Sequence, residues 1–207
     1  MEANFWLDRW TNNEIGWHEK DFHPLLTGHL HELALPHGSR VFVPLCGKTR
    51  DIAWLLQRGY QVAGSELSEL AVQQLFEELG VQASVTTVGK SQRYQAPMLD
   101  IFTGDLFELT QAQLGPVQAI YDRAALVALP PDMRIRYTKH LLAVTRNAPQ
   151  LLICFEYDQN QMAGPPHSVP GPEVWHHYGS TYSLTFAESR PMPIRGTPAD
   201  EVVWLLK

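Results

Sequence analysis

Short apolar runs and segments of helical periodicity alternate along the first half of the chain. Residues 39–45 lead into a turn at residues 46–48, and residues 51–59 follow with helical spacing and a terminal glycine. Residues 60–64 give a second apolar run, and residues 68–80 begin with a favoured capping serine and again show helical spacing. Consecutive parallel strands need a crossover connection, usually a helix. The alternation therefore predicts an α/β fold with a mostly parallel sheet covered on both faces.

Further apolar runs extend this pattern to the C-terminus. Residues 99–103, 117–121 and 150–157 are predicted strands, and residues 131–146 form a predicted helix before the last of them. Two more strand candidates stand close together near the end of the chain, and such a pair suggests an antiparallel hairpin. They are residues 182–187 and 201–206. The prediction is a Rossmann-like, doubly wound sheet of seven strands with a C-terminal antiparallel hairpin.

The N-terminal part of the chain lacks strand patterns. Residues 4–35 are rich in Trp, His and Phe, with leucines at helical spacing, and breaker residues follow at 36–38. We interpret residues 1–38 as a helical cover over the active site. The Pro- and Gly-rich residues 164–172 suit an interdomain linker or an active-site loop, but only 35 residues (207 − 172) follow them. The prediction is therefore a loop within a single domain of residues 1–207.

Composition narrows the range of partners. With 18% charged residues and a formal net charge of -6, the chain has no sign of a polyanion-binding surface, which argues against nucleic acid. Cys46 and Cys154 lie in or beside predicted strands, where free thiols pack as small hydrophobic groups, so no disulfide framework is expected. No apolar run reaches the length of about 18 residues that a membrane span needs. We expect a cytoplasmic monomer that acts on a small molecule, with no membrane partner.

The turn after the first strand and the acidic residue after the second form a candidate nucleotide site. In doubly wound sheets, ligands bind at the carboxyl ends of the strands, beside the first strand-to-helix turn. Gly47 lets the backbone approach a ligand, and Glu66 stands 19 positions later (66 − 47). An acid about 20 residues after such a turn can bind ribose hydroxyls. The alternative interpretation is that Gly47 only closes a turn and Glu66 is solvated at a helix start.

The same turn fails two phosphate-binding patterns. Residues 47–49 match the end of a phosphate-binding P-loop, but Phe42 replaces its first glycine. A dinucleotide fold needs three spaced glycines against the pyrophosphate, and only Gly47 is present. A cofactor with a ribose but no phosphate fits the turn better, and S-adenosylmethionine is such a molecule.

Five sequence motifs are distributed over nearly the whole chain. They are FWLDRW at 5–10, VPLCGK at 43–48, GSELS at 64–68, YDRAALVAL at 121–129, and GPP at 164–166 before the Val-Pro pair at 169–170. Together they resemble the thiopurine S-methyltransferase family, particularly its bacterial members. The resemblance implies a class I S-adenosylmethionine-dependent enzyme that methylates the sulfur of aromatic and heterocyclic thiols such as thiopurines. It also implies selenium or tellurium compounds as further acceptors, in detoxification.

The resemblance also implies site residues, position by position. The residues expected at the cofactor are Trp10, Leu45, Gly47, Glu66, Leu67 and Arg123, and those near the sulfonium and the acceptor are Trp6 and Trp17. Asp105, which follows the third predicted strand, sits where many methyltransferases contact adenine, although relatives carry different residues there.

Two of these residues also have direct physical interpretations. Trp10 can offer π density to a sulfonium, but an ordinary buried aromatic under the N-terminal helix is the alternative. Arg123 follows a predicted strand and should reach the carboxyl edge of the sheet, where it can act catalytically by favouring an ionised thiol. A surface ion pair with Asp122 is the alternative for this arginine. Arg190 and Arg195, between the last two strands, are further candidates for binding the acceptor.

Other functions fit the sequence less well. A nicotinamide-dependent oxidoreductase is disfavoured by the missing glycines, and a non-catalytic nucleotide-binding protein by the intact motifs. The histidine pairs at 29 and 31 and at 176 and 177 lack the partners and spacing of a zinc site, so no metal is expected. Cys46 has no base nearby in sequence that would make it a nucleophile.

Overall fold

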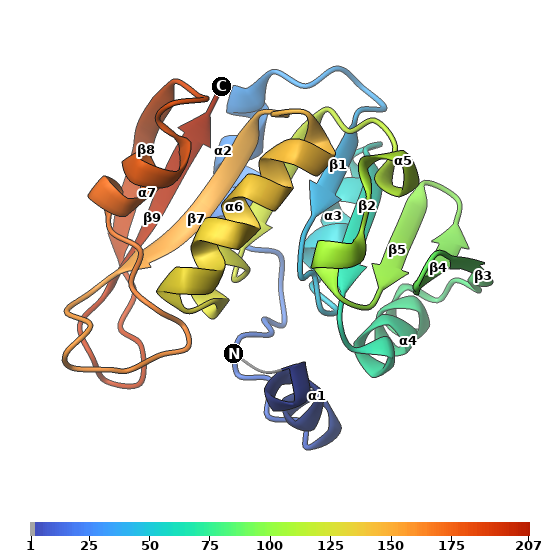
Figure 1. The fold of residues 1–207 in the computed structure, drawn as a ribbon, viewed down its shortest axis with the longest axis horizontal. Helices are drawn as coiled ribbons and strands as arrows, with labels where there is room; N and C mark the ends of the chain where they lie inside the picture. Colours follow the sequence, from blue (N-terminus) through green and yellow to red (C-terminus); the bar gives the residue numbers. More distant parts are fainter. Residues whose placement is uncertain (1–2) are drawn as a thin grey trace.

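One nine-stranded sheet runs through the protein, whose computed structural model describes residues 3–207 (Figure 1). Residues 1 and 2, which the predicted N-terminal cover includes, lie outside the described residues. The strands are β1 (Arg40–Val43), β2 (Gln61–Glu66), β3 (Ser84–Val88), β4 (Ser91–Ala96), β5 (Leu99–Thr103), β6 (Ala119–Arg123), β7 (Gln150–Glu156), β8 (Leu184–Pro191) and β9 (Asp200–Leu206). Their order across the sheet is β3-β4-β5-β2-β1-β6-β7-β9-β8.

The central strands are parallel, and the strand order reverses beside β1. β1 pairs with β2 on one side and with β6 on the other, and β5 and β7 extend the parallel set outward. β9 pairs antiparallel with β7 and with β8. The predicted fold class, a doubly wound α/β sheet with a C-terminal antiparallel hairpin, is therefore confirmed. Its switch point lies between β1 and β6, where ligands of such folds bind.

The predicted number of seven strands is wrong, because a hairpin of β3 and β4 extends the sheet beyond β5. β3 pairs antiparallel with β4, and β4 pairs antiparallel with β5. Four of the five residues of β3 are exposed. An edge hairpin of this kind buries little, so its sequence carries no regular apolar pattern that would reveal it.

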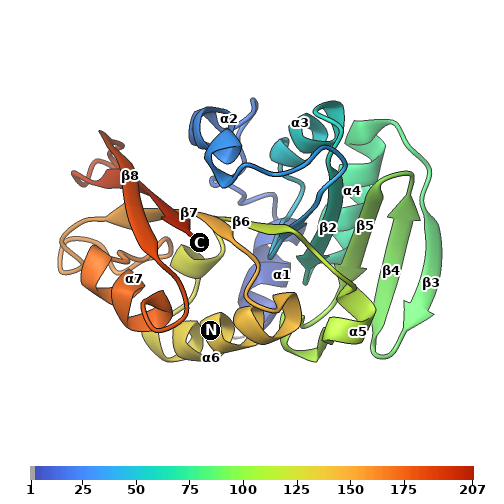
Figure 2. The same cartoon turned by 90° about the horizontal axis from the view of Figure 1, so that it is seen from above.

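Helices cover both faces of the sheet (Figure 2). On one face lie α2, α3 and α4, and on the other lie α5, α6 and α7. The helices are α1 (Ala3–Thr11), α2 (Pro24–His29), α3 (Asp51–Gln57), α4 (Glu69–Leu79), α5 (Gln111–Leu114), α6 (Pro131–Thr145) and α7 (Gly171–Tyr178), with the short 3-10 turns η1 (Leu30–Leu33), η2 (Leu106–Glu108) and η3 (Leu126–Ala128).

The two faces of β1 show how the sequence builds both layers. Val41 and Val43 belong to the apolar core under α2, α3 and α4, whereas Phe42 belongs to the core under α6 and α7. All three side chains are at most 2% exposed. Successive side chains of a strand point to opposite faces, so a continuous apolar run is what a strand covered on both sides requires.

The N-terminal segment divides into two parts. α2 and η1 contribute their leucines to the core on one face of the sheet, so they form part of that layer. α1 lies apart from them, beyond the carboxyl ends of the parallel strands (Figure 1), and contacts α4. Residues 3–23 thus lie at the edge of the sheet where the candidate site is expected, whereas residues 24–33 pack on its face.

The loop after β7 lies at the same edge. The amide of His167 donates to the carbonyl of Val127 in η3 at 2.6 Å. The buried guanidinium of Arg134 on α6 donates to the carbonyls of Ser168 at 3.1 Å and Leu129 at 2.8 Å. The Pro- and Gly-rich segment is therefore fixed against η3 and α6. Within residues 3–207, no helix combines the length and the apolar character that crossing a membrane requires.

Candidate functional site

The loop between β1 and α3 has a left-handed backbone at two positions. Leu45 has φ +48° and Gly47 has φ +52°. The loop is held to β2, because the amide of Cys46 donates to the carbonyl of Ser65 at 2.9 Å. A Cβ atom added at Gly47 would lie 2.9 Å from Cζ2 of Trp10. Glycine is therefore needed here both for its backbone conformation and for the close approach of the α1 indole.

Glu66 ends β2 directly against this loop. Its Oε2 accepts the amide hydrogen of Gly47 at 2.8 Å, and its Oε1 accepts that of Ser68 at 2.8 Å. The side chain is buried, with 6% exposure, which contradicts the alternative of a solvated acid at a helix start. Burial raises the pKa of Glu66, and the backbone hydrogen bonds partly offset this shift. Each carboxylate oxygen has two lone pairs, so both can accept a further hydrogen bond.

Three tryptophans form a cluster over the β1–α3 loop. The rings of Trp10 and Trp17 lie 5.9 Å apart, and those of Trp17 and Trp6 lie 5.2 Å apart, both pairs edge to face. Trp10 is 5% exposed and its indole lies on Gly47, while Trp6 and Trp17 are half-buried. The structure thus brings the three predicted aromatic residues together beside the turn.

Arg123 ends β6 and faces the N-terminal segment. Its Nη2 donates to Oε1 of Glu19, and its Nη1 donates to the carbonyl of Trp17 at 3.2 Å. The alternative pairing with Asp122 is wrong, because the two side chains are neighbours on a strand and point to opposite faces. Asp122 instead accepts from the Tyr137 hydroxyl at 2.8 Å within the core. Burial raises the pKa of Asp122 to about 6.

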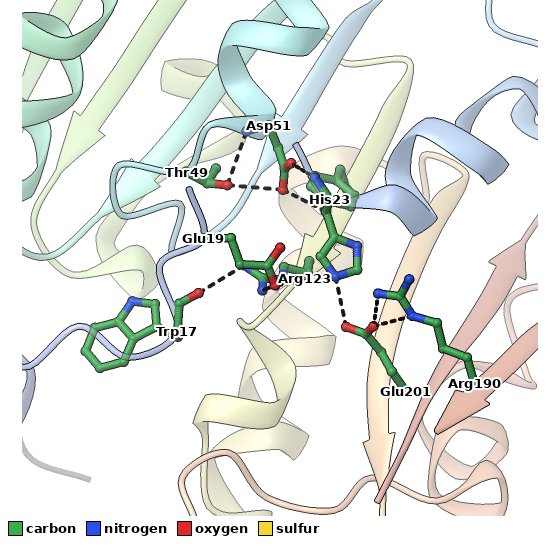
Figure 3. A network of polar contacts seen from close by, with 9 residues as sticks. Trp17, Glu19, His23, Thr49, Asp51, Arg123, Arg190 and Glu201 are labelled. Atoms are coloured by element: carbon green, nitrogen blue, oxygen red, sulfur yellow. Dashed lines mark hydrogen bonds and ion pairs between the residues drawn. The ribbon is translucent and has the colours of Figure 1, made fainter. Parts of the chain in front are cut away.

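A network of polar and ionisable side chains continues from Arg123 across the edge of the sheet (Figure 3). Nε2 of His23 lies 3.7 Å from Oε1 of Glu19 and 3.0 Å from Oε1 of Glu201. The other oxygen of Glu201 accepts from Nη2 of Arg190 at 2.6 Å. His23 and Glu201 are each 1% exposed, so this part of the network is fixed in the interior.

The backbone of His23 is also held by a buried side chain. Its amide donates to Oδ1 of Asp51 at 2.8 Å, and Oδ2 of Asp51 accepts from the Tyr121 hydroxyl at 2.9 Å. Asp51 is the first residue of α3 and is 1% exposed. The network therefore joins the N-terminal segment to α3, to β6 and to the C-terminal hairpin. Sequence reasoning missed Glu19, His23, Asp51 and Glu201, because no local spacing links positions so distant in the chain.

Leu45, Leu67 and Asp105, the other residues predicted at the cofactor, lie in two places. Leu45 and Leu67 are half-buried beside the loop and Glu66. Asp105 is exposed and caps η2 through the amide of Phe107 at 2.9 Å, next to Gly104, whose amide donates to the carbonyl of Glu66 at 2.9 Å.

The two C-terminal arginines differ in their surroundings. Arg190 is part of the charged network, whereas Arg195 lies exposed in the connection between β8 and β9. The structure therefore does not join Arg195 to the group around Arg123.

The cysteines have a different environment from that of a reactive thiolate. Both are free and buried. Burial, with the nearby Glu66 carboxylate, raises the pKa of Cys46 well above its ordinary value. The thiol therefore stays protonated at neutral pH, which agrees with the prediction that Cys46 is not a nucleophile. Across residues 3–207, no cluster of three His, Cys, Asp or Glu residues is arranged to hold a metal ion.

Comparison with known proteins places the chain among methyltransferases. The family profile "Thiopurine S-methyltransferase (TPMT)" matches residues 1–193. A thiopurine S-methyltransferase of Xanthobacter autotrophicus is 55% identical, over 100% of this chain and 99% of the relative. One of Teredinibacter turnerae is 47% identical, over 100% and 97%.

Solved structures share the fold at low sequence identity. The 1,6-didemethyltoxoflavin-N1-methyltransferase of Burkholderia thailandensis, solved with S-adenosylhomocysteine, aligns with a TM-score of 0.67 at 17% identity, over 99% of this chain and 86% of that one. The magnesium protoporphyrin IX methyltransferase of Synechocystis, also solved with S-adenosylhomocysteine, aligns with a TM-score of 0.62 at 14% identity, over 99% of both chains. These likenesses confirm the architecture of the sheet.

Proposed function

The chain belongs to the thiopurine S-methyltransferase family, and we propose that it transfers the methyl group of S-adenosylmethionine to the sulfur of aromatic and heterocyclic thiols such as thiopurines. The observation that carries this proposal is the contact of Glu66 with Gly47 at the carboxyl edge of the sheet. A nicotinamide-dependent oxidoreductase and a non-catalytic nucleotide-binding protein have no support from the comparisons. The proposal takes residues 1–207 as one methyltransferase domain, with residues 3–23 as the cover of its site.

The residues around Glu66 fit the adenosyl part of the donor. The carboxylate keeps free lone pairs that can accept from two ribose hydroxyls, and such charge-assisted bonds contribute about 1.5 to 3 kcal/mol. Leu45, in the loop, and Leu67, next to Glu66 in the chain, are half-buried apolar residues that can add surface for the adenosyl group. Asp105 follows β5, the neighbour of β2, and is assigned to the adenine end. The loop supplies no phosphate-binding glycine pattern, which suits a ligand without phosphates.

The tryptophans and Arg123 fit the methionine part and the acceptor. S-adenosylmethionine, when bound, supplies an electrophilic methyl group on a positively charged sulfur. Trp10 offers a π face to that charge, an attraction of roughly 0.5 to 2 kcal/mol. Trp6 and Trp17 exclude water from the place where the acceptor meets the donor. Arg123 holds an anion at this edge, either the carboxylate of the donor or the ionised acceptor.

This arrangement accounts for catalysis without a dedicated base. Methyl transfer demands mainly alignment and a short approach distance, and positioning alone can remove roughly 7 to 11 kcal/mol of barrier. Aromatic thiols ionise readily, and a guanidinium nearby favours their anions. Arg190 adds a second cation toward the C-terminal hairpin, whereas Arg195 belongs to an exposed connection at its tip.

Three further features complete the proposal. Selenium and tellurium compounds share the soft, polarisable nucleophilic atom of a thiolate, so they are candidate acceptors in detoxification. Both cysteines are free thiols, as in proteins of the reducing cytoplasm. The protein is also proposed to act as a monomer.

The decisive experiment combines ligand binding with product formation. Calorimetry should detect binding of S-adenosylhomocysteine, and a screen of thiopurines, aryl thiols, selenite and tellurite with a labelled methyl donor should identify the acceptors. NADH serves as the control ligand, since it shares the adenosine but requires a pyrophosphate site. The proposal is refuted if neither S-adenosylmethionine nor S-adenosylhomocysteine binds, or if NADH alone raises the melting temperature.

A further inference from the structure

The anion-binding groups of Arg123 are occupied by the protein itself. Nη2 donates to Oε1 of Glu19 and Nη1 donates to the carbonyl of Trp17 at 3.2 Å, so both partners come from the N-terminal segment (Figure 3). The Arg123 side chain is only 12% exposed. A ligand anion that approaches this guanidinium therefore meets a site that already holds a carboxylate.

Glu19 is the replaceable member of this network. Its side chain is 35% exposed, whereas those of His23 and Glu201 are each 1% exposed. The Glu19 carboxylate is partly exposed to water, which screens its attraction to the guanidinium, so this ion pair is weaker than one that is buried at both ends. A buried ion pair is far costlier to break. A competing anion can therefore displace Glu19 more readily than any other charge in the network.

His23 gives the displaced carboxylate no second strong site. Nε2 of His23 lies 3.7 Å from Oε1 of Glu19, but it is closer to Glu201, at 3.0 Å. Glu201 in turn accepts from Arg190 through Nε at 3.0 Å and Nη2 at 2.6 Å. The inner part of the network is thus neutralised without Glu19, and Glu19 depends on Arg123 for its charge compensation.

We propose that Glu19 is an internal competitor that occupies the anion position of Arg123 and has to leave it when an anionic ligand binds. The inference rests on the proposed function, because it assigns the competing anion to a ligand of that reaction. The shared chemistry is a single negative charge presented to a guanidinium, and two sources offer it: the carboxylate of the methyl donor and the ionised thiol of the acceptor. Glu19 thereby lowers the affinity for that ligand and ties its binding to a shift of the N-terminal segment.

The test compares Glu19→Gln with the wild-type protein by calorimetry. Glutamine keeps the shape and an acceptor oxygen but removes the charge. Three probes separate the two sources of the anion. S-adenosylhomocysteine carries the carboxylate, methylthioadenosine lacks the amino-acid part, and para-nitrothiophenol, added to the protein saturated with S-adenosylhomocysteine, presents a thiolate. Glu14→Gln is the matched control, because Glu14 pairs with Arg9 in the same segment, with Nη1 to Oε2 at 3.4 Å, away from Arg123.

Removal of the competing charge should strengthen the binding of the anionic ligand about two- to fivefold, as expected for loss of a partly exposed ion pair. If S-adenosylhomocysteine binds more tightly and the affinity for methylthioadenosine is unchanged, the anion position belongs to the donor carboxylate. If para-nitrothiophenol binds more tightly and the affinity for S-adenosylhomocysteine is unchanged, the anion position belongs to the acceptor. Glu14→Gln should bind all three probes as the wild type does.

Other results overturn the inference. Unchanged or weaker binding of both anionic probes would show that Glu19 does not compete. If the affinity for methylthioadenosine rises as much as that for the anionic probes, the substitution has opened the site in general. An unchanged melting temperature of Glu19→Gln excludes misfolding as the cause of weaker binding, and a variant that fails to fold is replaced by Glu19→Ala with the same expected signs. If the wild type binds no S-adenosylhomocysteine, the proposed function falls as well; if it binds but Glu19→Gln is unaltered, only this inference falls.

Discussion

The amide nitrogen of Gly47 lies 2.8 Å from Oε2 of Glu66, so the carboxylate that we propose as the ribose-binding group also fixes the β1–α3 loop. Its second oxygen fixes the start of α4 in the same way, through the amide of Ser68 at 2.8 Å. Glu66 therefore has a structural role beside its proposed role in binding, so a variant of this residue has to be tested for both stability and ligand affinity.

Replacing Glu66 should weaken binding of the cofactor product. Glu66→Ala removes charge-assisted hydrogen bonds of about 1.5 to 3 kcal/mol, which corresponds to roughly 10- to 100-fold weaker binding. Glu66→Gln keeps one acceptor oxygen and should fall between the alanine variant and the wild type. Calorimetry with S-adenosylhomocysteine measures the affinity, and urea denaturation measures the loss of the loop contacts. An alanine variant that binds as tightly as the wild type would remove Glu66 from the site.

Gly47→Ala should destabilise the fold more than Gly80→Ala, a replacement that causes backbone strain but no close contact. At Gly47 the added Cβ lies 2.9 Å from the Trp10 ring, and φ is +52°. At Gly80, the C-cap of α4, φ is +66° and nothing lies within 4 Å, so Gly80→Ala reports the strain alone, about 1 kcal/mol.

The comparison of the two alanine variants isolates the contact with α1. We expect Gly47→Ala to lose about 1 to 3 kcal/mol more than Gly80→Ala in urea denaturation, because the rigid indole has to move. Adding Trp10→Phe to Gly47→Ala should recover part of this difference. Equal losses for Gly47→Ala and Gly80→Ala would show that the Trp10 ring moves away at little cost.

Periodic patterns predicted most of the fold, because each strand that is covered on both faces has to be apolar. Ser68 accepts the amide hydrogen of Ala71 at 3.3 Å and Gly80 ends α4 in a left-handed conformation, as their positions in the sequence indicate. The β3–β4 hairpin was missed because it pairs at an edge and exposes most of β3. The β-branched residues 85–88 favour an extended backbone, but they give no apolar pattern of the kind that marks a covered strand.

The candidate site was predictable only where its parts are close in sequence or follow a strand. Gly47 and Glu66 fit the spacing of a strand–helix–strand unit, and the contact between them confirms that they are brought together. Arg123 was placed correctly at the edge, but its partner Glu19 stands 104 positions away, so no local pattern reveals it. Asp122 is adjacent to Arg123 in sequence, but its side chain lies on the opposite face of the sheet, because side chains alternate along a strand.

Removing Arg123 should slow methylation and change its pH dependence. A cation favours the ionised thiol, so its loss raises the pKa of the bound acceptor by about 1 unit or more. The acidic limb of the pH–rate profile for an aryl thiol should therefore move to higher pH in Arg123→Ala. Steady-state rates between pH 5 and pH 9 measure this shift. Arg58→Ala is the matched control, because Arg58 is exposed at the end of α3 and packs over the ring of Trp54.

A profile of Arg123→Ala that superimposes on that of the wild type would show that the thiolate is stabilised elsewhere. Arg190→Ala and Arg195→Ala then decide between the other two cations. Arg190→Ala leaves the buried Glu201 without its guanidinium, so its effect on stability has to be measured beside its effect on rate.

Asp122 should make the stability of the protein fall as pH rises through the weakly acidic range. Burial raises its pKa from 3.8 to about 6 in the folded state, so the native protein holds a proton that the unfolded chain has released. Stability linked to such a group is fully present below the unfolded pKa and is lost as pH rises through the folded value. The shift corresponds to about 3 kcal/mol in total, of which about 2 kcal/mol is lost between pH 4 and pH 7.

Asp122→Asn isolates this contribution, because asparagine does not titrate. The side-chain amide of the new asparagine faces two donors, the Tyr137 hydroxyl and the Leu126 amide, which lowers the free energy of unfolding by the same amount at every pH. The free energy of unfolding of the wild type minus that of the variant should therefore decrease by about 2 kcal/mol from pH 4 to pH 7, as measured by urea denaturation. A difference that stays constant over this range would mean that Asp122 is already ionised in the folded protein at pH 4, held by its three donors: the Tyr137 hydroxyl, the Leu126 amide and the Gln150 side chain.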